Sequence, residues 1–153
     1  NYSDYADQQM NDIFSEEELK DAAVLTAKNL ATSYIENLGD GKFSSIPLPS
    51  ATQFSPVYGM LVKDLDNDGH LDILMGGNFF GARVKYGRYD ANKGIFLLGN
   101  GKGDFSTVPT NLSGLGIDGE VRDIMPLALE NGSELIIFAK NNSALDIYEI
   151  TKN

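Results

Sequence analysis

The segment 64–72 constrains the fold of this chain more than any other. Its acidic residues occupy the first, third, fifth and ninth positions of a short loop, and glycine occupies the sixth: Asp64, Asp66, Asp68, Asp72 and Gly69. Two carboxylates ~4 Å apart repel each other by roughly 1 kcal/mol even in water. Ca²⁺ removes this cost by binding about six to eight oxygen ligands. The spacing therefore predicts a calcium loop, in which Gly69 makes the turn because glycine tolerates positive φ.

The first half of this loop matches the EF-hand pattern, whereas the second half does not. An EF-hand requires a glutamate at position 12, and here that position is Met75. The flanking runs, 59–63 and 71–75, are short, apolar and rich in residues that favour strands. We therefore predict a loop between two strands, with side-chain ligands from the four aspartates and a backbone carbonyl ligand from His70. The alternative is a solvated acidic turn, because Asp-Gly and Asn-Asp are common turn dipeptides.

The composition favours a turn-rich β domain and argues against several kinds of site. The 153 residues are enough for one ordinary core, and they include 16 glycines, eight phenylalanines and seven tyrosines. Cysteine is absent, which excludes disulfides, zinc–thiolate clusters and cysteine nucleophiles. The net charge of −10 argues against binding nucleic acid or an anionic membrane through a basic patch.

Residues 1–32 differ from the rest of the chain, and we assign them to an N-terminal arm with a short helix. A capping-box pattern begins at Ser15 and predicts a helix from the next residue. This helix either continues as far as Leu30 or stops early and is followed by a strand over Val24–Ala27. No stretch approaches about 18 apolar residues, so we expect no membrane-spanning helix, and no signal peptide is recognised. Because the chain begins without methionine, we expect it to be processed, cut or partial.

From residue 33 onward, hairpin patterns predict antiparallel strands. Tyr34–Leu38 has the composition of a strand, residues 39–42 of a turn, and Phe43 begins the returning strand. The pattern of this hairpin returns in variant form at Asn100–Phe105, where Phe105 takes the place of Phe43. The closing segment Leu145–Ile150 alternates apolar and polar residues, which predicts a half-buried strand.

A second pattern recurs at a similar spacing. Segment 59–64 resembles 119–123, and segment 71–74 resembles 134–137. This matching places Asp123 in the position of Asp64, but the other ligands are missing, so we predict no metal in the second copy. Both patterns indicate a repeat of roughly 60 residues, and regular repeats of this kind are typical of propellers and arrays.

The acidic loop resembles the calcium loop of FG-GAP/VCBS repeats, which form the blades of integrin-α-like β-propellers. The hairpins at 37–43 and 100–105 resemble the Asn-x-Gly-x-Gly-x-Phe hairpins of the same repeats. The stretch through Gly76-Gly77-Asn78, Gly87–Ala91 and Gly94–Phe105 is similar to the C-terminal region of Bacteroidetes VCBS-repeat proteins of the ASPIC/UnbV type. The resemblance covers roughly residues 13–140.

The resemblance implies an all-β fold of propeller blades over residues 33–153. It also implies a protein that acts in binding or adhesion at an extracellular, cell-surface or periplasmic location. The chain departs from the family because only one repeat keeps its ligands. Its length also suits about two to three four-stranded antiparallel units, whereas propellers close with about four to eight blades. We therefore expect a segment of a larger propeller that is completed by further blades or by other chains.

Other candidate chemistry is weaker. His70 is the single histidine, and we expect its side chain to face solvent, so a histidine-centred catalytic site is not predicted. Acid pairs capable of glycoside hydrolysis are not evident outside the acidic loop. The glycine-rich run 99–103 lacks the phosphate-loop pattern.

A basic stretch within 83–89 offers two interpretations. Its cations and tyrosines suit the docking of a glycan or an anionic peptide: Arg83, Lys85, Arg88, Tyr86 and Tyr89. We favour internal salt bridges, for example between Arg88 and Asp90. We likewise favour core or blade–blade packing for Phe79 and Phe80 over a role as a binding platform.

Together these observations predict a non-enzymatic, calcium-binding β-propeller segment that supports protein or glycan recognition, with no catalytic residues. Two alternatives remain. One is a hydrolase or lyase with its site on a propeller face. The other is a structural subunit of an envelope assembly.

Overall fold

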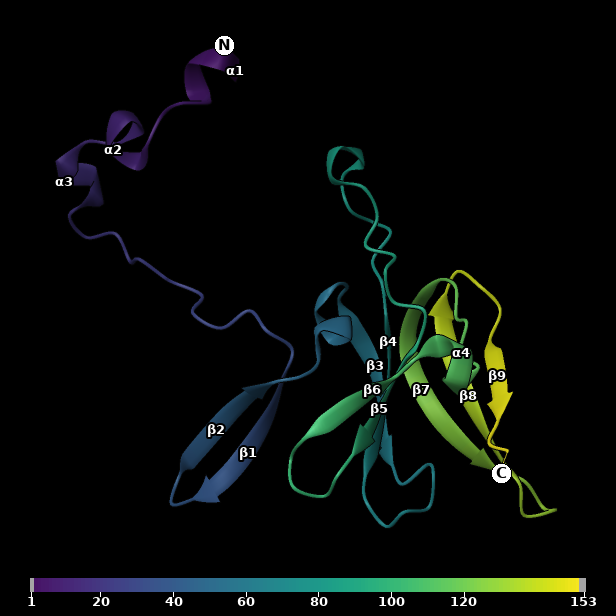
Figure 1. The fold of residues 1–153 in the computed structure, drawn as a ribbon. Coiled ribbons are helices and arrows are strands. Elements are labelled where there is room, and N and C mark those ends of the chain that lie inside the picture. Colours follow the sequence, from purple (N-terminus) through teal and green to yellow (C-terminus); the bar gives the residue numbers. More distant parts are fainter. Residues whose placement is uncertain (1, 152–153) are drawn as a thin grey trace. The chain divides into compact units, whose positions relative to one another are not determined.

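The computed structural model describes residues 2–151 of the chain. The chain divides after Leu30 into an N-terminal unit and a larger unit that begins at Ala31 (Figure 1). Among the described residues, no helix has both the length and the apolar character needed to cross a bilayer.

The described part of the N-terminal unit contains three four-residue helices, α1 (Tyr2–Tyr5), α2 (Met10–Ile13) and α3 (Glu16–Leu19). Helix α3 begins at the predicted capping box. Ser15 Oγ accepts a hydrogen bond from the Glu18 amide at 3.4 Å, and Glu18 Oε2 accepts one from the Ser15 amide at 2.9 Å. The hydrogen bonds that Glu18 Oε2 accepts from the Ser15 amide and from Ser15 Oγ hold the pKa of Glu18 below its ordinary value, because they stabilise the carboxylate.

The predictions for the rest of this unit are wrong. Residues 22–30 are irregular, so the helix neither reaches Leu30 nor is followed by a strand over Val24–Ala27. Leu25 and Leu30 are exposed, and a helix without a buried apolar face is marginal in water. Helices α1 and α2 were not predicted, because four-residue turns carry no periodicity.

From Ala31 onward, the described chain forms three antiparallel sheets, which confirms the predicted all-β class. The first sheet is the hairpin of β1 (Ser33–Gly39) and β2 (Lys42–Pro47). The second has the order β3 (Val57–Lys63), β4 (Asp72–Gly77), β5 (Ile95–Gly99) and β6 (Phe105–Val108). The third has the order β7 (Glu120–Ala128), β8 (Glu134–Asn141) and β9 (Asp146–Glu149). Short helices η1 (Ser50–Gln53), η2 (Val84–Tyr86) and α4 (Thr110–Ser113) lie in the connections. The described strands do not close into a propeller.

Both predicted hairpins are present, and an asparagine begins each turn. In the first, the Asn37 side chain accepts a hydrogen bond from the Gly39 amide at 2.9 Å, and the central residues Asp40 and Gly41 have φ of 50° and 72°. Two positive φ values are typical of the type I′ turns that match strand twist. In the second, Asn100 Oδ1 accepts from the amides of Lys102 and Asp104 at 2.8 and 3.2 Å.

Strands at corresponding places in the three sheets begin at a nearly constant spacing of roughly 60 residues. The pairs of first residues are Ser33 and Ile95, Lys42 and Phe105, Val57 and Glu120, and Asp72 and Glu134. This register corrects the predicted matching of Asp123 with Asp64. Asp123 lies inside β7, paired with Ala139, whereas the counterpart of the acidic loop is the turn 129–133 between β7 and β8. The likeness of segment 119–123 to 59–64 is misleading because β7 is longer than β3.

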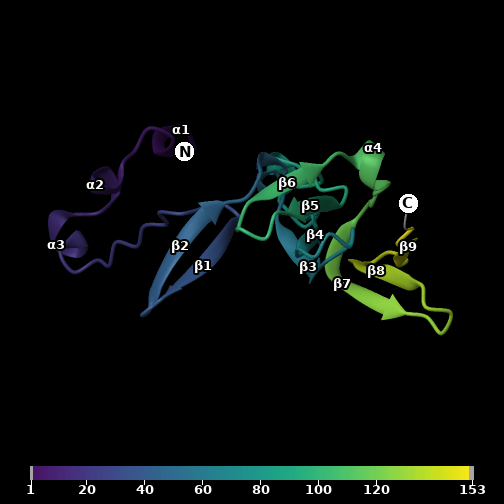
Figure 2. The same cartoon turned by 60° about the horizontal axis from the view of Figure 1, so that its bottom comes forward.

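All six residues of β4 are buried, and the middle sheet lies between the β1–β2 hairpin and the third sheet (Figure 2). Ile73 and Met75 point into one cluster, with Leu48, Ile95 and Leu97, against which Tyr34 of β1 packs. Leu74 points into the other cluster, with Val121, Ile124, Ile136 and Phe138 of the third sheet. Each buried side chain of this size contributes roughly 1.5–3 kcal/mol.

Glycines permit the close approach of the second and third sheets. A Cβ on Gly76 would lie 2.6 Å from Val121 Cγ1, and one on Gly59 would lie 3.1 Å from the backbone of Asp123. The β3 and β4 strands therefore reach β7 at a separation that larger residues would not allow.

Candidate functional site

The acidic loop connects β3 to β4, as predicted. Lys63 and Asp72 are paired across the two strands, so the loop between them is closed at its base. Asp64 and Asp66 lie on the loop, and Asp72 is the first residue of β4.

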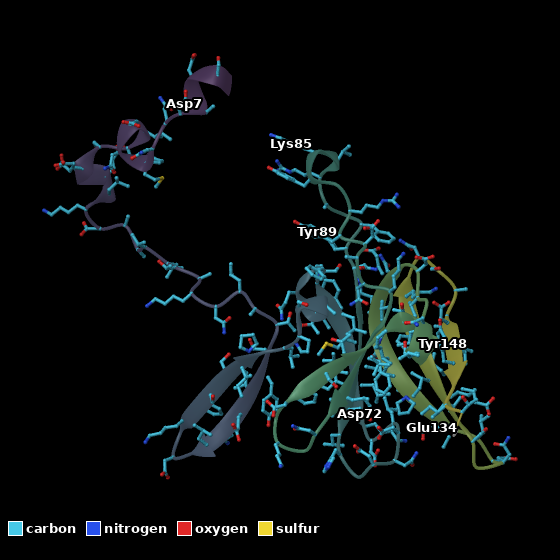
Figure 3. The ribbon with its side chains drawn as sticks, viewed as in Figure 1. Asp7, Asp72, Lys85, Tyr89, Glu134 and Tyr148 are labelled. Carbon is cyan, nitrogen blue, oxygen red and sulfur yellow. The ribbon has the colours of Figure 1, made fainter. Side chains whose placement is uncertain are left out.

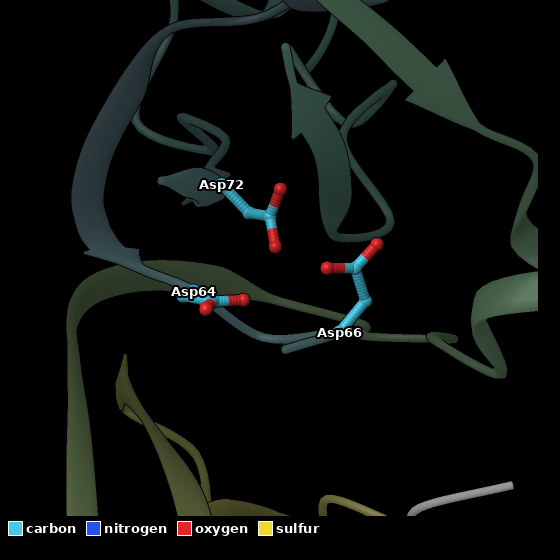
Figure 4. A group of neighbouring side chains, drawn as sticks. All are labelled: Asp64, Asp66 and Asp72. Atoms are coloured by element: carbon cyan, nitrogen blue, oxygen red, sulfur yellow. The ribbon is translucent and has the colours of Figure 1, made fainter. Parts of the chain in front are cut away.

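Three of the predicted ligands converge. One carboxylate oxygen from each of Asp64, Asp66 and Asp72 lies within 4.8 Å of the others. Figure 4 shows these three carboxylates directed toward a common centre. At 4.8 Å, a pair of such charges repels by about 0.9 kcal/mol in water and by about 3.5 kcal/mol at an effective dielectric constant of about 20.

Asp72 is the anchor of this group, and it has no exposed surface. Its Oδ2 accepts a hydrogen bond from the Leu65 amide at 2.9 Å, and its Oδ1 accepts one from the Gly99 amide at 3.0 Å. The buried carboxylate therefore ties the start of the loop to the end of β5.

The loop backbone wraps around its own side chains. The Asp68 amide donates to Asp66 Oδ1 at 3.1 Å, and the Gly69 amide donates to Asp64 Oδ2 at 3.1 Å. Asn67 and Gly69 have φ of 64° and 90°, which confirms the predicted turn at the glycine. These bonds leave Asp64 Oδ1 buried and without a hydrogen-bond partner among the described residues.

Two predicted ligands stand apart from the group. Asp68 does not belong to the cluster, and its Oδ1 accepts a hydrogen bond from the His70 amide at 2.7 Å. The His70 side chain is exposed, as predicted, and its ring lies beside Gly101 on the neighbouring hairpin. Ligation by the Asp68 carboxylate and the His70 carbonyl remains a prediction.

The oxygen set suits a hard cation. Oxygens bound to one Ca²⁺ at about 2.3–2.6 Å lie no more than about 5.2 Å apart, so the three carboxylates can share one ion. The unpartnered Asp64 oxygen is an orphaned acceptor that a cation would satisfy.

At the corresponding place in the third sheet, the acidic residue is paired with a lysine and not with other acids. Glu134 begins β8 as Asp72 begins β4, and both its carboxylate oxygens accept from Lys63 Nζ at 2.6 and 2.5 Å. An ammonium group from the second sheet therefore neutralises the acid at the equivalent position. Figure 3 shows Asp72 and Glu134 at the same end of the sheets.

A second polar centre lies at the other end of β4, and it was not predicted. Asn78 is 1% exposed, with φ of 83°. Its Oδ1 accepts from Ser55 Oγ and the Asn92 amide at 2.8 and 2.9 Å, and its Nδ2 donates to the carbonyls of Asn92 and Gly119 at 2.7 and 2.9 Å. One side chain thus joins the segments that precede β3, β5 and β7. The sequence signal that could have pointed to this centre is the polar residue Asn78 directly after the apolar run of β4.

Glu120 extends this polar centre along β7. Its Oε1 accepts from the Phe80 amide at 2.9 Å and from Arg122 at 2.7 Å, and its Oε2 accepts from Asn141 Nδ2 at 3.0 Å. These hydrogen bonds hold the pKa of Glu120 below its ordinary value, and the bond from the Phe80 amide has the largest effect. The Arg122 guanidinium also lies 4.5 Å from the ring centroid of Tyr58, so the β7 charge pair is packed against β3.

The connection from β4 to β5 is the longest in the three sheets. Residues 78–94 join these strands, whereas residues 142–145 join β8 to β9. We call residues 79–91 the arm from here on, which is a different segment from the N-terminal residues 1–32. Lys85 and Tyr89 mark it in Figure 3. Backbone hydrogen bonds between Phe79 and Tyr89, at 2.9 and 3.0 Å, close its base.

Two sequence-based interpretations of the arm are wrong. Phe79 and Phe80 belong to neither buried apolar cluster, because both lie on the arm beyond the sheets. Arg88 makes no ion pair with Asp90 in the described part of the chain, and its guanidinium instead lies 5.0 Å from the ring centroid of Phe80.

The chain matches no family model, no curated protein and no solved structure.

Proposed function

We propose that the sheet unit, from Ala31 onward, forms a non-enzymatic binding scaffold, a segment of a β-propeller whose β3–β4 hairpin is stiffened by Ca²⁺. The observation that carries this proposal is the convergence of Asp64, Asp66 and Asp72 around a buried, unpartnered carboxylate oxygen. Three carboxylates held this closely repel one another, a bound cation would offset that repulsion, and an all-oxygen ligand set suits Ca²⁺.

The role of the ion in this proposal is structural. Asp72 is hydrogen-bonded both to the loop and to the end of β5, so an ion bound to it would fix the loop against the second sheet. Asp72 is fully buried and both its carboxylate oxygens accept backbone hydrogen bonds, so this carboxylate is not presented to a substrate in solution. A stiffened turn is therefore better supported than a catalytic centre.

The propeller part of the proposal rests on the strand spacing and the stacking of the sheets. Corresponding strands recur at a nearly constant spacing, and the second and third sheets pack face to face through β3, β4 and β7. In this register β1 and β2 match β5 and β6, so the first sheet lacks counterparts of β3 and β4. An extracellular setting suits the proposal because calcium modules there work at about 10⁻⁴–10⁻³ M affinity.

Titration calorimetry with Ca²⁺ tests the metal site. The wild-type chain is expected to bind one ion, and Asp66→Asn is expected to weaken binding by about tenfold or more. Asp66→Asn is a suitable change because an asparagine Oδ1 still accepts the Asp68 amide. Asp40→Asn in the β1–β2 turn is the matched control and is expected to bind as the wild type does. Equal binding heats for Asp66→Asn and wild type would refute the site.

A second candidate, a structural subunit of a larger assembly, is favoured by one further observation. A groove of about 840 Å³ separates β1 from the face of β3 and β4. The exposed apolar side chains of Ile35, Met60, Val62 and Leu71 line it. Exposed apolar area of this kind is typical of surfaces that another segment or chain covers.

A further inference from the structure

The arm collects positive charge on a strongly acidic chain. It holds three cations, Arg83, Lys85 and Arg88, against one carboxylate, Asp90. The arm therefore carries a formal charge of +2, and since the whole chain carries −10, the remainder carries −12.

The cations of the arm are not neutralised within the chain. In the part of the molecule that is described, Arg83 and Lys85 make neither an ion pair nor a side-chain hydrogen bond. Arg88 lies over the Phe80 ring, a contact that orients the guanidinium and leaves its N–H groups available. An Arg or Lys group without an acidic neighbour is ready to receive one from a partner.

The base of the arm is fixed, although its tip is exposed. Phe79 and Tyr89 are joined by two backbone hydrogen bonds, and the Phe80 amide donates to Glu120 of β7. Asn78, the residue directly before the arm, is held by four side-chain hydrogen bonds and so anchors the base of the arm. A loop held at its base loses less entropy when it binds a partner.

The tip combines charge with apolar surface. Val84 is 99% exposed between Arg83 and Lys85, and Tyr86 is 70% exposed. The arm leaves the end of β4 that lies opposite the acidic cluster, so its tip projects away from that cluster (Figure 1).

We propose that the arm is the docking site for an acidic polypeptide segment. The proposal rests on the binding function proposed above and names its partner. Guanidinium groups pair with carboxylates through two parallel hydrogen bonds, and Val84 and Tyr86 offer apolar contact to neighbouring side chains. A bilayer of anionic lipid is less suited, because an extended negative surface would also face the acidic remainder. A polysaccharide would make little use of Val84.

Fluorescence anisotropy with a labelled peptide of alternating glutamate and leucine tests this assignment. We expect saturable binding that weakens with salt, and no binding of the peptide in which glutamine replaces glutamate. Arg83→Glu with Lys85→Glu is expected to weaken binding by at least about tenfold. The matched control, Lys42→Glu with Lys102→Glu, makes the same change in net charge at the turns of the β1–β2 and β5–β6 hairpins. It is expected to weaken binding by less than about threefold.

Several outcomes would overturn the proposal. Equal losses in both charge-reversed pairs would show that net charge alone drives binding. Equal affinity for the glutamate and glutamine peptides would remove the role of carboxylates. Binding to heparin or to anionic vesicles, but not to the peptide, would assign the arm to another partner. Unchanged melting temperatures of the variants guard against unfolding, and a retained calcium response would leave the proposed scaffold intact if the arm assignment failed.

Discussion

Asn78 joins three segments of the chain through one buried side chain. Replacement of Asn78 by alanine removes four hydrogen bonds. It also places alanine at a backbone φ of 83°, in the left-handed region that asparagine tolerates better. We expect Asn78→Ala to lower the free energy of unfolding by at least about 3 kcal/mol, measured by urea denaturation.

Asn92→Ala is the matched control for this change. Asn92 is also buried, but its side chain accepts only the Gly94 amide, and its Nδ2 has no partner in the described part of the chain. Its loss is expected to cost about 1 kcal/mol. Equal destabilisation by the two changes would contradict the assigned role of Asn78.

The lowered pKa of Glu120 predicts how the stability of the fold depends on pH. Because hydrogen bonds from Phe80 and Asn141 lower its pKa below 4.5 in the folded state, this carboxylate stabilises the fold above its ordinary pKa. The contribution is lost as the pH falls through the lowered pKa. We expect Glu120→Gln to melt below the wild type at about pH 7, and the difference to shrink toward about pH 3.

Thermal melts across this pH range check the expectation. Glu36→Gln, at an exposed position on β1, is the control and should follow the wild-type curve. A difference between Glu120→Gln and wild type that stays constant with pH would show that the carboxylate charge is not the cause.

At the residue scale, the local part of the site was predictable and the distant part was not. Asp64, Asp66 and Asp72 follow from spacing, since all three belong to one loop and the strand that leaves it. The contacts of Glu120 with Phe80, and of Lys63 with Glu134, join residues 40 and 71 positions apart. No local pattern specifies such pairs, because they depend on how the sheets stack.

At the scale of elements, the contact between β4 and β7 depends on the absence of a side chain. A Cβ at Gly76 would lie 2.6 and 2.8 Å from two carbons of Val121. We expect Gly76→Ala to destabilise the fold by about 1–3 kcal/mol through overpacking, measured by denaturant unfolding.

Two further variants make this test specific. Gly116→Ala is the control, since a Cβ there meets nothing within 4 Å. Val121→Ala should relieve the clash, so the double variant is expected to lose less stability than the two single changes added together. If the stability losses of the two single variants simply add in the double variant, then the added Cβ at Gly76 does not clash with Val121.

Strands were more predictable than helices for a physical reason. The strands around 57–63, 72–77 and 146–149 alternate or form short apolar runs, and tight turns mark their ends. The helix at Ser15 was found because its capping box is local, whereas its end was not, because helix length depends on burial that the sequence does not specify. The arm replaces a short turn, so its shape had no counterpart in the repeat.

At the scale of the whole molecule, the chain from Ala31 onward is organised as stacked antiparallel sheets with a nearly constant strand spacing. The two ends of β4 carry different polar groups: the acidic cluster at Asp72 and the asparagine centre at Asn78. The proposed ion would hold one end of the sheet stack, and the Asn78 network holds the other, from which the arm projects. The class of the fold and a division near residue 32 could be predicted from alternation, turns and composition, and the structure divides the chain after Leu30; the two-sided burial of β4 emerges only from packing.

The most direct test of the calcium proposal is the melting temperature of the chain with Ca²⁺ and with a chelator. At Ca²⁺ about 100-fold above its dissociation constant, binding contributes about 2.7 kcal/mol, so the wild type should melt about 5–10 °C higher than in chelator. Asp66→Asn, which binds about tenfold more weakly or worse, should lose about half of this gain or more, yet melt slightly above the wild type in chelator, because it removes one of three mutually repelling charges. The same calcium-dependent rise in Asp66→Asn and wild type, or no rise in either, would contradict a cation bound between Asp64, Asp66 and Asp72.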